Sequence, residues 1–422
     1  MGFLGALLKT IIILCIFLGA LILLPGLPPS TTFPFKEYVI KPPRELNGVL
    51  QTNFHLDKAK QLWKDRIFGP ECLLVFEEKI YTGIHSGEVI GLSNEETIQP
   101  ITKIGQPCDY IFDDELCGYP VGLALDTQGK NLIVADSYYG VWQVNLATKA
   151  KTRLVSKEQI LPGKKVNRRA KLFNSLAVSR QGEIYWTDSL SDDFVLAPFA
   201  NPSGRLFRYN REKKTNEVLL DELAFANGLA LSPGEDFIIV AETTAMRLTK
   251  YYLKGSRAGQ SEVFVDGLPG WPDNLTSDSE GIWVPLSVAS DSENPNLFAS
   301  LAPYPRLRSI LARLVGLMQL PFRISNYIYP NDIAARLFHS FNEMATNAAP
   351  NRSTVVRVDW KGNIVRSLHG FDRSASGISH VLEIKGDLYL GSPFNQYIAK
   401  VKLPDYVAKS VKETKTNEDQ LI

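Results

Sequence analysis

The stretch Asn227–Glu242, NGLALSPGEDFIIVAE, has an alternating apolar run, a turn with proline and glycine, and a second run rich in β-branched residues. This pattern predicts a β-hairpin with largely buried strands. Five other segments follow the same plan: CLLVFEEKIYTG (72–83), GLALDTQGKNLIVAD (122–136), SLAVSRQGEIYWTD (175–188), NLTSDSEGIWVPL (274–286) and SHVLEIKGDLYLGS (379–392). The first five units start 46–53 residues apart, and further strand-like runs follow most of them. A period near 40–50 residues with four strands per unit predicts an all-β fold, a six-bladed β-propeller.

Composition narrows the class of protein. The chain has 422 residues, 45% of them hydrophobic and 22% charged, with a formal net charge of +1. A globular core is therefore expected, and a nucleic-acid partner is not, because no basic stripe is present. The sequence also contains no zinc-ligand spacing, phosphate-binding loop or GxSxG elbow.

The N-terminus carries an apolar segment. Residues 3–24 are apolar apart from Lys9 and Thr10, which is long enough to cross a bilayer. No A-x-A-like cleavage site follows the apolar run, so we expect residues 1–27 to be an uncleaved signal anchor of a single-pass protein of the endomembrane system or plasma membrane. A cleaved signal peptide is the alternative. The flanking charges do not fix the orientation.

Composition also sets the domain boundaries. Residues 28–45 are rich in proline and polar residues and are expected to be a linker. The propeller is expected over 46–405, with a short helix at 56–65 in its lead-in segment. A helical insertion at about 288–352 is expected between the fifth and sixth blades, and residues 406–422 form a polar tail.

The insertion contains a helix with one apolar face. The residues expected on that face are Leu307, Ile310, Leu311, Leu314, Val315 and Met318. The residues expected off it are Arg306, Arg308 and Arg313. Such a helix is either a lid packed over the propeller or a membrane-surface helix, and the sequence does not separate the two.

Two cysteines indicate the compartment. Cys108 and Cys117 flank the acidic segment DYIFDDEL, and a disulfide between them is expected, with two free thiols as the alternative. A disulfide would place the propeller in the lumen or outside the cell. Two N-x-S/T sequons occur: Asn351 is expected to carry a glycan, whereas Asn274 is expected to be buried without one.

Oxygen-bearing side chains recur where the repeated units begin. Because the first strands of propeller blades line the central channel, these side chains are expected to converge. The four are Glu71, Asn174, Asn227 and Asp273. Two carboxylates and two amide carbonyls suit one Ca²⁺ ion, and Asn274 can add a fifth oxygen. The alternative is a water-filled polar channel in which acids and amides bond each other.

Particular motifs carry a family resemblance. NGLALSPGEDFIIVAET, the later LPGWPDNL, and GPE at 69–71 resemble the strictosidine synthase-like six-bladed propellers, over roughly residues 45–403. Paraoxonases and related calcium-dependent lactonases resemble the chain more distantly. The latter resemblance implies that the five oxygen-bearing residues match catalytic calcium ligands. The acids that hold a second calcium are replaced by Cys72 and Ser175, and the histidine pair by Val121 and Asp136.

The expected function is calcium-dependent hydrolysis of a small aryl ester or lactone, with Asp136 or His380 as the base. One alternative is a non-catalytic, membrane-tethered binding or adhesion propeller. A strictosidine-type condensation of an amine with an aldehyde, with Glu383 as the base, is a further alternative. The sequence indicates no particular protein partner. The remaining histidines are expected to be ordinary loop or surface residues: His55, His85, His339 and His369.

Overall fold

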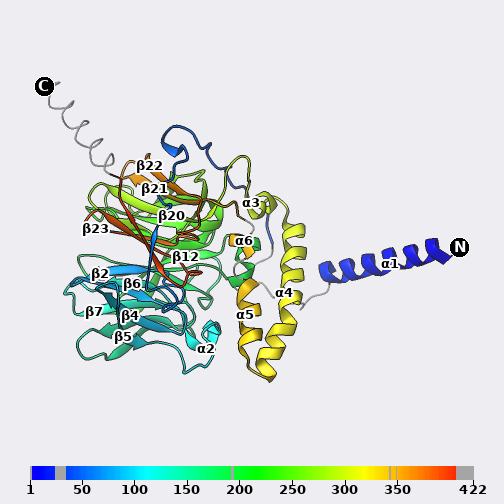
Figure 1. The fold of residues 1–422 in the computed structure, drawn as a ribbon, viewed down its shortest axis with the longest axis horizontal. Helices are drawn as coiled ribbons and strands as arrows, with labels where there is room; N and C mark the ends of the chain where they lie inside the picture. Colours follow the sequence, from blue (N-terminus) through cyan, green and yellow to red (C-terminus); the bar gives the residue numbers. More distant parts are fainter. Residues whose placement is uncertain (1, 24–34, 192–193, 342–343, 348, 405–422) are drawn as a thin grey trace.

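The computed structural model describes residues 2–23, 35–191, 194–341, 344–347 and 349–404, and its fold is mostly β (Figure 1). Residues 28–34 of the expected linker and all of the expected tail at 406–422 lie outside the described residues. The described strands form six antiparallel sheets, and most have four strands.

The first three sheets follow one another along the chain. The first holds β2 (Leu73–Phe76), β3 (Lys79–Gly83), β4 (Glu88–Ser93) and β5 (Thr97–Lys103). The second holds β6 (Pro120–Leu125), β7 (Asn131–Asp136), β8 (Gly140–Asn145) and β9 (Lys151–Ser156). The third holds β10 (Phe173–Val178), β11 (Ile184–Asp188), β12 (Gly204–Asn210) and β13 (Thr215–Leu223).

The remaining sheets complete the set. The fourth holds β14 (Ala226–Leu231), β15 (Phe237–Glu242), β16 (Arg247–Tyr252) and β17 (Ser261–Val265). The fifth holds β18 (Gly270–Pro272), β19 (Thr276–Ser277), β20 (Gly281–Ala289), β21 (Ser353–Asp359) and β22 (Ile364–Gly370). The sixth holds β23 (His380–Ile384), β24 (Asp387–Gly391), β25 (Ile398–Lys402) and β1 (Lys60–Leu62).

The hairpin quoted first from the sequence forms β14 and β15. Leu229 pairs with Val240, and Ala230 pairs with Ile239. All four side chains are buried, because each sheet is covered on both faces by its neighbours. This explains why the second run is continuously apolar instead of alternating.

Hydrophobic clusters join each sheet to the next. Ile133 of the second sheet, for example, lies in one cluster with Trp186 of the third. The sixth sheet packs on the first in the same way, through Leu382 and Ile398 against Ile80. The succession of sheets therefore closes on itself, which directs the start of each sheet toward a common centre.

The closing strand corrects one expectation. Residues 56–65 do not form a helix: β1 lies within them and pairs with β25, with Lys60 opposite Lys400 and Leu62 opposite Ile398. The lysine and alanine content of this segment favours a helix locally. Burial of Leu62 between two sheets outweighs that preference.

The inserted helices lie within a sheet. They are α3 (Leu297–Leu301), α4 (Pro305–Ile328), α5 (Asp332–Ser340) and α6 (Met344–Asn347). They connect β20 to β21, which are hydrogen-bonded neighbours in the fifth sheet. Our placement of the insertion between two blades was therefore wrong, because β21 and β22 had not been recognised as the outer strands of the fifth unit.

The buried face of α4 also differs from the expected one. Arg308, Ala312, Val315 and Gln319 are buried, whereas Met318 is 60% exposed. The guanidinium of Arg308 is enclosed because it donates to the Phe199 carbonyl oxygen at 2.9 Å. A buried arginine is not recognisable from the apolar periodicity of the sequence.

The N-terminal helix α1 (Gly2–Leu23) stands away from the sheets (Figure 1). Its segment Phe3–Ala20 is long and apolar enough to cross a membrane, and no other described helix is. The shorter helices are α2 (Asp114–Cys117) and the 3-10 turns η1 (Gly48–Leu50), η2 (Phe194–Phe199) and η3 (Thr243–Ala245).

Candidate metal site and cavity

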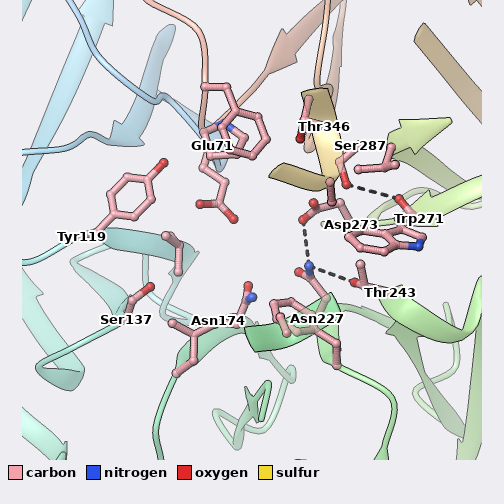
Figure 2. A pocket seen from close by; sticks show the side chains of 18 of the residues that line it. Glu71, Tyr119, Ser137, Asn174, Asn227, Thr243, Trp271, Asp273, Ser287 and Thr346 are labelled. Carbon is pink, nitrogen blue, oxygen red and sulfur yellow. Dashed lines mark hydrogen bonds between the residues drawn. The ribbon is translucent and has the colours of Figure 1, made fainter. Parts of the chain in front are cut away.

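The structure brings the four oxygen-bearing side chains to one cavity. Asn174 and Asn227 are the second residues of β10 and β14, Glu71 precedes β2, and Asp273 follows β18. Figure 2 shows them pointing into a shared space, and each is no more than 8% exposed. The cavity that they line has a volume of about 110 Å³.

Glycines let the strand starts approach one another. A Cβ atom added to Gly228 would meet the Asp273 carbonyl oxygen at 2.3 Å, and one added to Gly122 would meet that of Asn174 at 2.2 Å. Any other residue at these positions would push apart the backbones that carry the site. The GLAL motif of the second and fourth units therefore has a structural cause.

The two asparagines share a hydrogen-bonding pattern. Asn227 Nδ2 donates to Asp273 Oδ1 at 2.9 Å and to Thr243 Oγ1 at 3.2 Å. Asn174 Nδ2 donates to Ser189 Oγ at 3.0 Å. The Oδ1 atoms of both residues are buried and have no protein hydrogen-bond partner. A buried unpaired carbonyl costs about 1–3 kcal/mol, so these two oxygens fit a site that accepts a cation.

The pKa values of the two carboxyl groups, Glu71 and Asp273, are both raised. Burial, followed by the nearby charge of Asp273, raises the pKa of Glu71 well above its usual range. Burial raises the pKa of Asp273 as well. Two buried acids without a cation resist ionisation, whereas a divalent ion between them would favour it. Within the described ranges no group of three or more His, Cys, Asp or Glu side chains could hold a metal. Glu71, Asn174, Asn227 and Asp273 offer carboxylate and amide oxygens, which would suit Ca²⁺ better than Zn²⁺.

We call Glu71, Asn174, Asn227 and Asp273 the oxygen ring. Asn274 follows Asp273 directly and does not line the cavity. It is 2% exposed, which agrees with the expectation that its sequon is buried. Neither its Oδ1 nor its Nδ2 atom has a hydrogen-bond partner. Its amide is close enough to Glu71 to lower the pKa of that carboxyl group, and its role as a fifth oxygen donor stays a prediction.

A second group of side chains on the cavity wall was missed by sequence reasoning. His85 Nδ1 is 2.7 Å from Asp114 Oδ1, and its Nε2 is 3.0 Å from the Pro393 carbonyl oxygen. His339, on α5, places Nδ1 3.8 Å from Asp114 Oδ2, and that nitrogen has no hydrogen-bond partner. Both histidines and Asp114 are buried and line the cavity. His85 and His339 are therefore not the ordinary loop or surface residues that we expected.

Tyr119 connects the two groups. Its ring stacks on His85 at a centroid distance of 4.1 Å, and its hydroxyl donates to the Gly69 carbonyl oxygen at 2.8 Å. The charges of Glu71 and Asp114 both reach this tyrosine and, after burial, raise its pKa. The oxygen ring and the histidine–aspartate group are thus parts of one continuous wall.

The disulfide Cys108–Cys117 is present, as expected, with 5.3 Å between its Cα atoms. It closes the loop that carries Asp114, which begins α2. The same loop touches the insertion, because Asn326 Nδ2 donates to Asp113 Oδ2 at 3.2 Å. The cross-link therefore ties the carboxylate of Asp114 to the first sheet beside the cavity.

The two proposed bases do not line the cavity. Asp136 is fully buried and its Oδ1 accepts the backbone N–H groups of Tyr138 and Tyr139, both at 3.0 Å. His380 Nε2 lies 2.9 Å from Thr276 Oγ1, between the fifth and sixth sheets. Burial lowers the pKa of His380 to about 3. The cavity lining does not include them, so the structure gives no support to either as the base, and that role stays a prediction.

Two further residues named from the sequence lie outside the cavity. Glu383 is exposed and accepts a hydrogen bond from Trp283 Nε1 at 3.2 Å, so it is not placed as a base for condensation. Asn351 is exposed and donates to the Phe371 carbonyl oxygen at 2.9 Å. Glycosylation of Asn351 stays a prediction.

Comparison with family models identifies the class of protein. The model described as strictosidine synthase matches residues 174–256, and that described as strictosidine synthase-like, N-terminal, matches residues 48–92. The matched regions include the inner strands that carry Glu71, Asn174 and Asn227. These two regions thus match strictosidine synthase-like models, as the motifs of the sequence predicted.

Curated relatives define the family more closely. The chain is 60% identical over 410 residues to the adipocyte plasma membrane-associated protein Hemomucin of Drosophila melanogaster, covering 96% of this chain and 71% of the relative. It is 32% identical over 395 residues to the adipocyte plasma membrane-associated protein of Homo sapiens, covering 92% and 86%. The chain belongs to this adipocyte plasma membrane-associated protein family.

Solved structures share the fold. A gluconolactonase from Xanthomonas campestris superposes with a TM-score of 0.51 at 16% identity, covering 89% of this chain and all of the other. A luciferin-regenerating enzyme superposes with a TM-score of 0.50 at 12% identity, covering 82% and 95%. At such low identity the likeness concerns architecture, and activity has to be argued from the site.

Proposed function

We propose that the chain is a membrane-anchored, six-bladed propeller that binds one Ca²⁺ ion at its centre and hydrolyses small aryl esters or lactones. The main observation in support of this proposal is that two buried carboxylates and two unpaired amide oxygens line one cavity. Lactonase activity in an enzyme of the same fold is consistent with this reaction class. Each of the six sheets would serve as one blade.

The residues of the ring would share the work of holding the ion. Glu71 and Asp273 balance its charge, while the Oδ1 atoms of Asn174 and Asn227 complete part of the oxygen shell. A bound Ca²⁺ would polarise the ester carbonyl and stabilise negative charge that develops on its oxygen. Asn274, whose Oδ1 is also buried and unpaired, would add a fifth oxygen.

We assign the proton transfer to the histidine–aspartate group. Burial is the main cause that lowers the pKa of His339 to about 4, so its imidazole is neutral and can accept a proton at pH 7. His339 takes a proton from the attacking water as the new carbon–oxygen bond forms, and returns it to the departing alcohol or phenol oxygen. Asp114, held by His85, would stabilise the protonated form of the imidazole through its charge, with Oδ2 3.8 Å from His339 Nδ1.

The site is proposed to act in the lumen or outside the cell. The disulfide favours an oxidising compartment, and relatives are named as plasma membrane-associated proteins. The helix α1 would then be the single membrane anchor, and a glycan on Asn351 would face solvent. Cleavage of α1 as a signal peptide would instead release the propeller.

The test uses the full chain in lipid nanodiscs. Bound calcium and phenyl acetate turnover are measured for the wild type, for Asn227→Ala, and for Asn363→Ala in an exposed turn as the matched control. We expect Asn227→Ala to lose calcium and turnover together, and the control to keep both. Turnover that survives chelation would exclude the mechanism, while calcium binding without turnover on any ester would favour the non-catalytic binding or adhesion propeller.

A further inference from the structure

The outward face of α4 combines exposed apolar side chains with arginines. Opposite the buried face lie Leu320 at 37% exposure, Ile324 at 48%, Tyr327 at 90% and Ile328 at 74%. By helical spacing, Arg306 and Arg313 fall on this same outward side. We name Leu320, Ile324, Tyr327 and Ile328 the α4 apolar patch.

The patch continues past the end of the helix. Tyr329 is 75% exposed and Ile333, in the first turn of α5, is 71% exposed. Few soluble surfaces leave aromatic and aliphatic residues this exposed in succession, and contiguous apolar surface marks a contact site. Some other molecule or surface is therefore expected to cover this end of α4.

Charge indicates what kind of surface that is. The segment Pro305–Ile328 contains no aspartate or glutamate and four arginines, of which Arg308 is buried and the other three are not. An apolar stripe with arginines beside it is the composition of helices that lie in the interfacial layer of a bilayer and attract anionic headgroups. A second copy of this chain would bring its own arginines against these and would be repelled.

The connection to α1 places a bilayer close by. Twelve residue steps separate Leu23 from Phe35, and a chain of this length spans at most about 42 Å. Phe35 and Tyr38 are held against α4, since the Arg308 guanidinium lies 5.5 Å and 4.7 Å from their ring centroids. Figure 1 shows α4 on the side of the sheets that faces α1.

The apolar helix α1 does not itself cover the patch. None of its candidate membrane segment Phe3–Ala20 is buried, although α1 contacts α4. Within the described residues, then, the patch is left exposed next to a helix suited to the bilayer. The lipid surface in which α1 sits is the continuous apolar medium nearest to it.

We propose that the α4 apolar patch docks into the lipid surface beside α1, preferentially where anionic headgroups are present. The insertion then touches the bilayer with its outer side, while its inner side contributes His339 and Thr346 to the cavity. The inference concerns membrane contact and stands apart from the proposed hydrolysis. It favours the membrane-surface alternative for this helix over a lid without membrane contact.

The test is photo-crosslinking in nanodiscs with the full chain. A phosphatidylcholine carrying a photoactivatable acyl chain is included, with or without about 30% phosphatidylserine, and adducts are mapped by mass spectrometry. The variant is Leu320→Ser, Ile324→Ser, Ile328→Ser combined. The matched control replaces three exposed aliphatic residues elsewhere, Val75→Ser, Val263→Ser and Val365→Ser, which are 39%, 49% and 48% exposed.

We expect wild-type adducts on both α1 and residues 320–333, with the latter increased by phosphatidylserine. In the patch variant, the ratio of adducts on residues 320–333 to adducts on α1 should fall about fivefold. In the valine control this ratio should stay unchanged. Adducts confined to α1, or equal on 320–333 in the patch variant, would overturn the proposal. So would cross-links between two chains at this segment, which would identify a second copy as the occupant.

Discussion

The oxygen ring and the histidine–aspartate group face the same cavity but have different origins in the chain. Glu71, Asn174, Asn227 and Asp273 begin repeated units, so each occupies an equivalent position in a sheet. Asp114 and His339 instead come from a disulfide-closed loop and an inserted helix, outside the repeated strands. In the proposed function, the repeats would thus supply the calcium ligands, whereas the loop and the insertion would supply the groups for proton transfer.

This difference suggests separable roles. A change in the ring should remove the ion and everything that depends on it. A change in the histidine–aspartate group should leave the ion bound and slow the reaction alone. Experiments that score calcium and turnover independently therefore test the comparison directly.

The largest effect is expected from Asp273→Asn. The substitution keeps the shape of the side chain but removes one of the two charges that would balance the ion. We expect bound calcium to be lost and turnover to fall about 10²–10³-fold, because the electrostatic stabilisation of the reacting carbonyl disappears with it. Calcium content and aryl ester turnover are measured on the same preparation.

Asp109→Asn is the matched control for that variant, since Asp109 is an exposed aspartate away from the ring. It should behave as the wild type in both measurements. If Asp273→Asn kept its calcium, the oxygen ring would not be the ion site. The assignment of ion binding to the repeated units would then be wrong.

The next effect is expected from His339→Gln. Turnover should fall by about 10²-fold, the contribution of a positioned base, while bound calcium stays unchanged. In the wild type, burial lowers the pKa of His339 to about 4, so the rate should decline only as pH falls toward that value. A pH–rate profile with calcium present at every pH measures this.

A glutamine at position 339 should lose that acidic limb together with most of the rate. His55→Gln, in the lead-in segment, serves as the control for histidine replacement in general. An unchanged profile in His339→Gln would assign proton transfer to another group and leave the insertion as a roof over the cavity.

A third prediction concerns stability without the ion. The pKa values of Glu71 and Asp273 are raised in the folded state, so protonation of these acids favours folding. Their stabilising contribution is complete below the pKa values of the unfolded chain and is lost as pH rises through the folded ones. In chelator, thermal stability should therefore fall between mildly acidic and neutral pH.

Calcium should reverse that loss at neutral pH. At a free concentration a hundredfold above its dissociation constant, it would stabilise the fold by about 2.7 kcal/mol. Thermal unfolding with and without calcium, at two pH values, separates the contribution of acid protonation from that of calcium binding. Stability in chelator that rises with pH would show that the two acids are not held protonated together.

The smallest effect on turnover is expected from Cys108→Ser with Cys117→Ser. Loss of this short cross-link should destabilise the chain by about 2–3 kcal/mol and lower turnover severalfold, because Asp114 is no longer held beside His339. Calcium binding should persist. Unfolding midpoints and turnover are compared with those of Cys72→Ser, which removes a buried thiol outside the loop.

The sequence predicted the repeated part of the molecule well. The strands recur with a regular period, so the inner positions could be counted from the turns, and the four oxygen-bearing residues lie together. The structure adds the reason for the glycines in two of these units, because Gly228 and Gly122 lie where a Cβ atom would collide with a neighbouring backbone carbonyl. The disulfide between Cys108 and Cys117 also followed from local spacing.

The rest could not be counted in this way. His85 follows β3, and His339 lies on α5, so their shared contact with Asp114 depends on how a loop and an insertion fold back over the sheets. The sequence signals for the histidine–aspartate group were the acidic loop between two cysteines and a histidine in a helical segment. Asp136 and His380 were chosen by their positions along the strands, and strand position alone did not bring them into the lining of the cavity.

The pairing of β1 with β25 has a consequence for biosynthesis. Lys60 and Lys400 are opposite one another, although 340 residues separate them (400 − 60). During synthesis the apolar N-terminal helix emerges first, long before the partner of β1 has been translated. Until Ile398 and its neighbours arrive, the sixth sheet keeps an open edge that other strands can pair with. A chain interrupted upstream of β25 would thus expose an unpaired strand and be prone to aggregation.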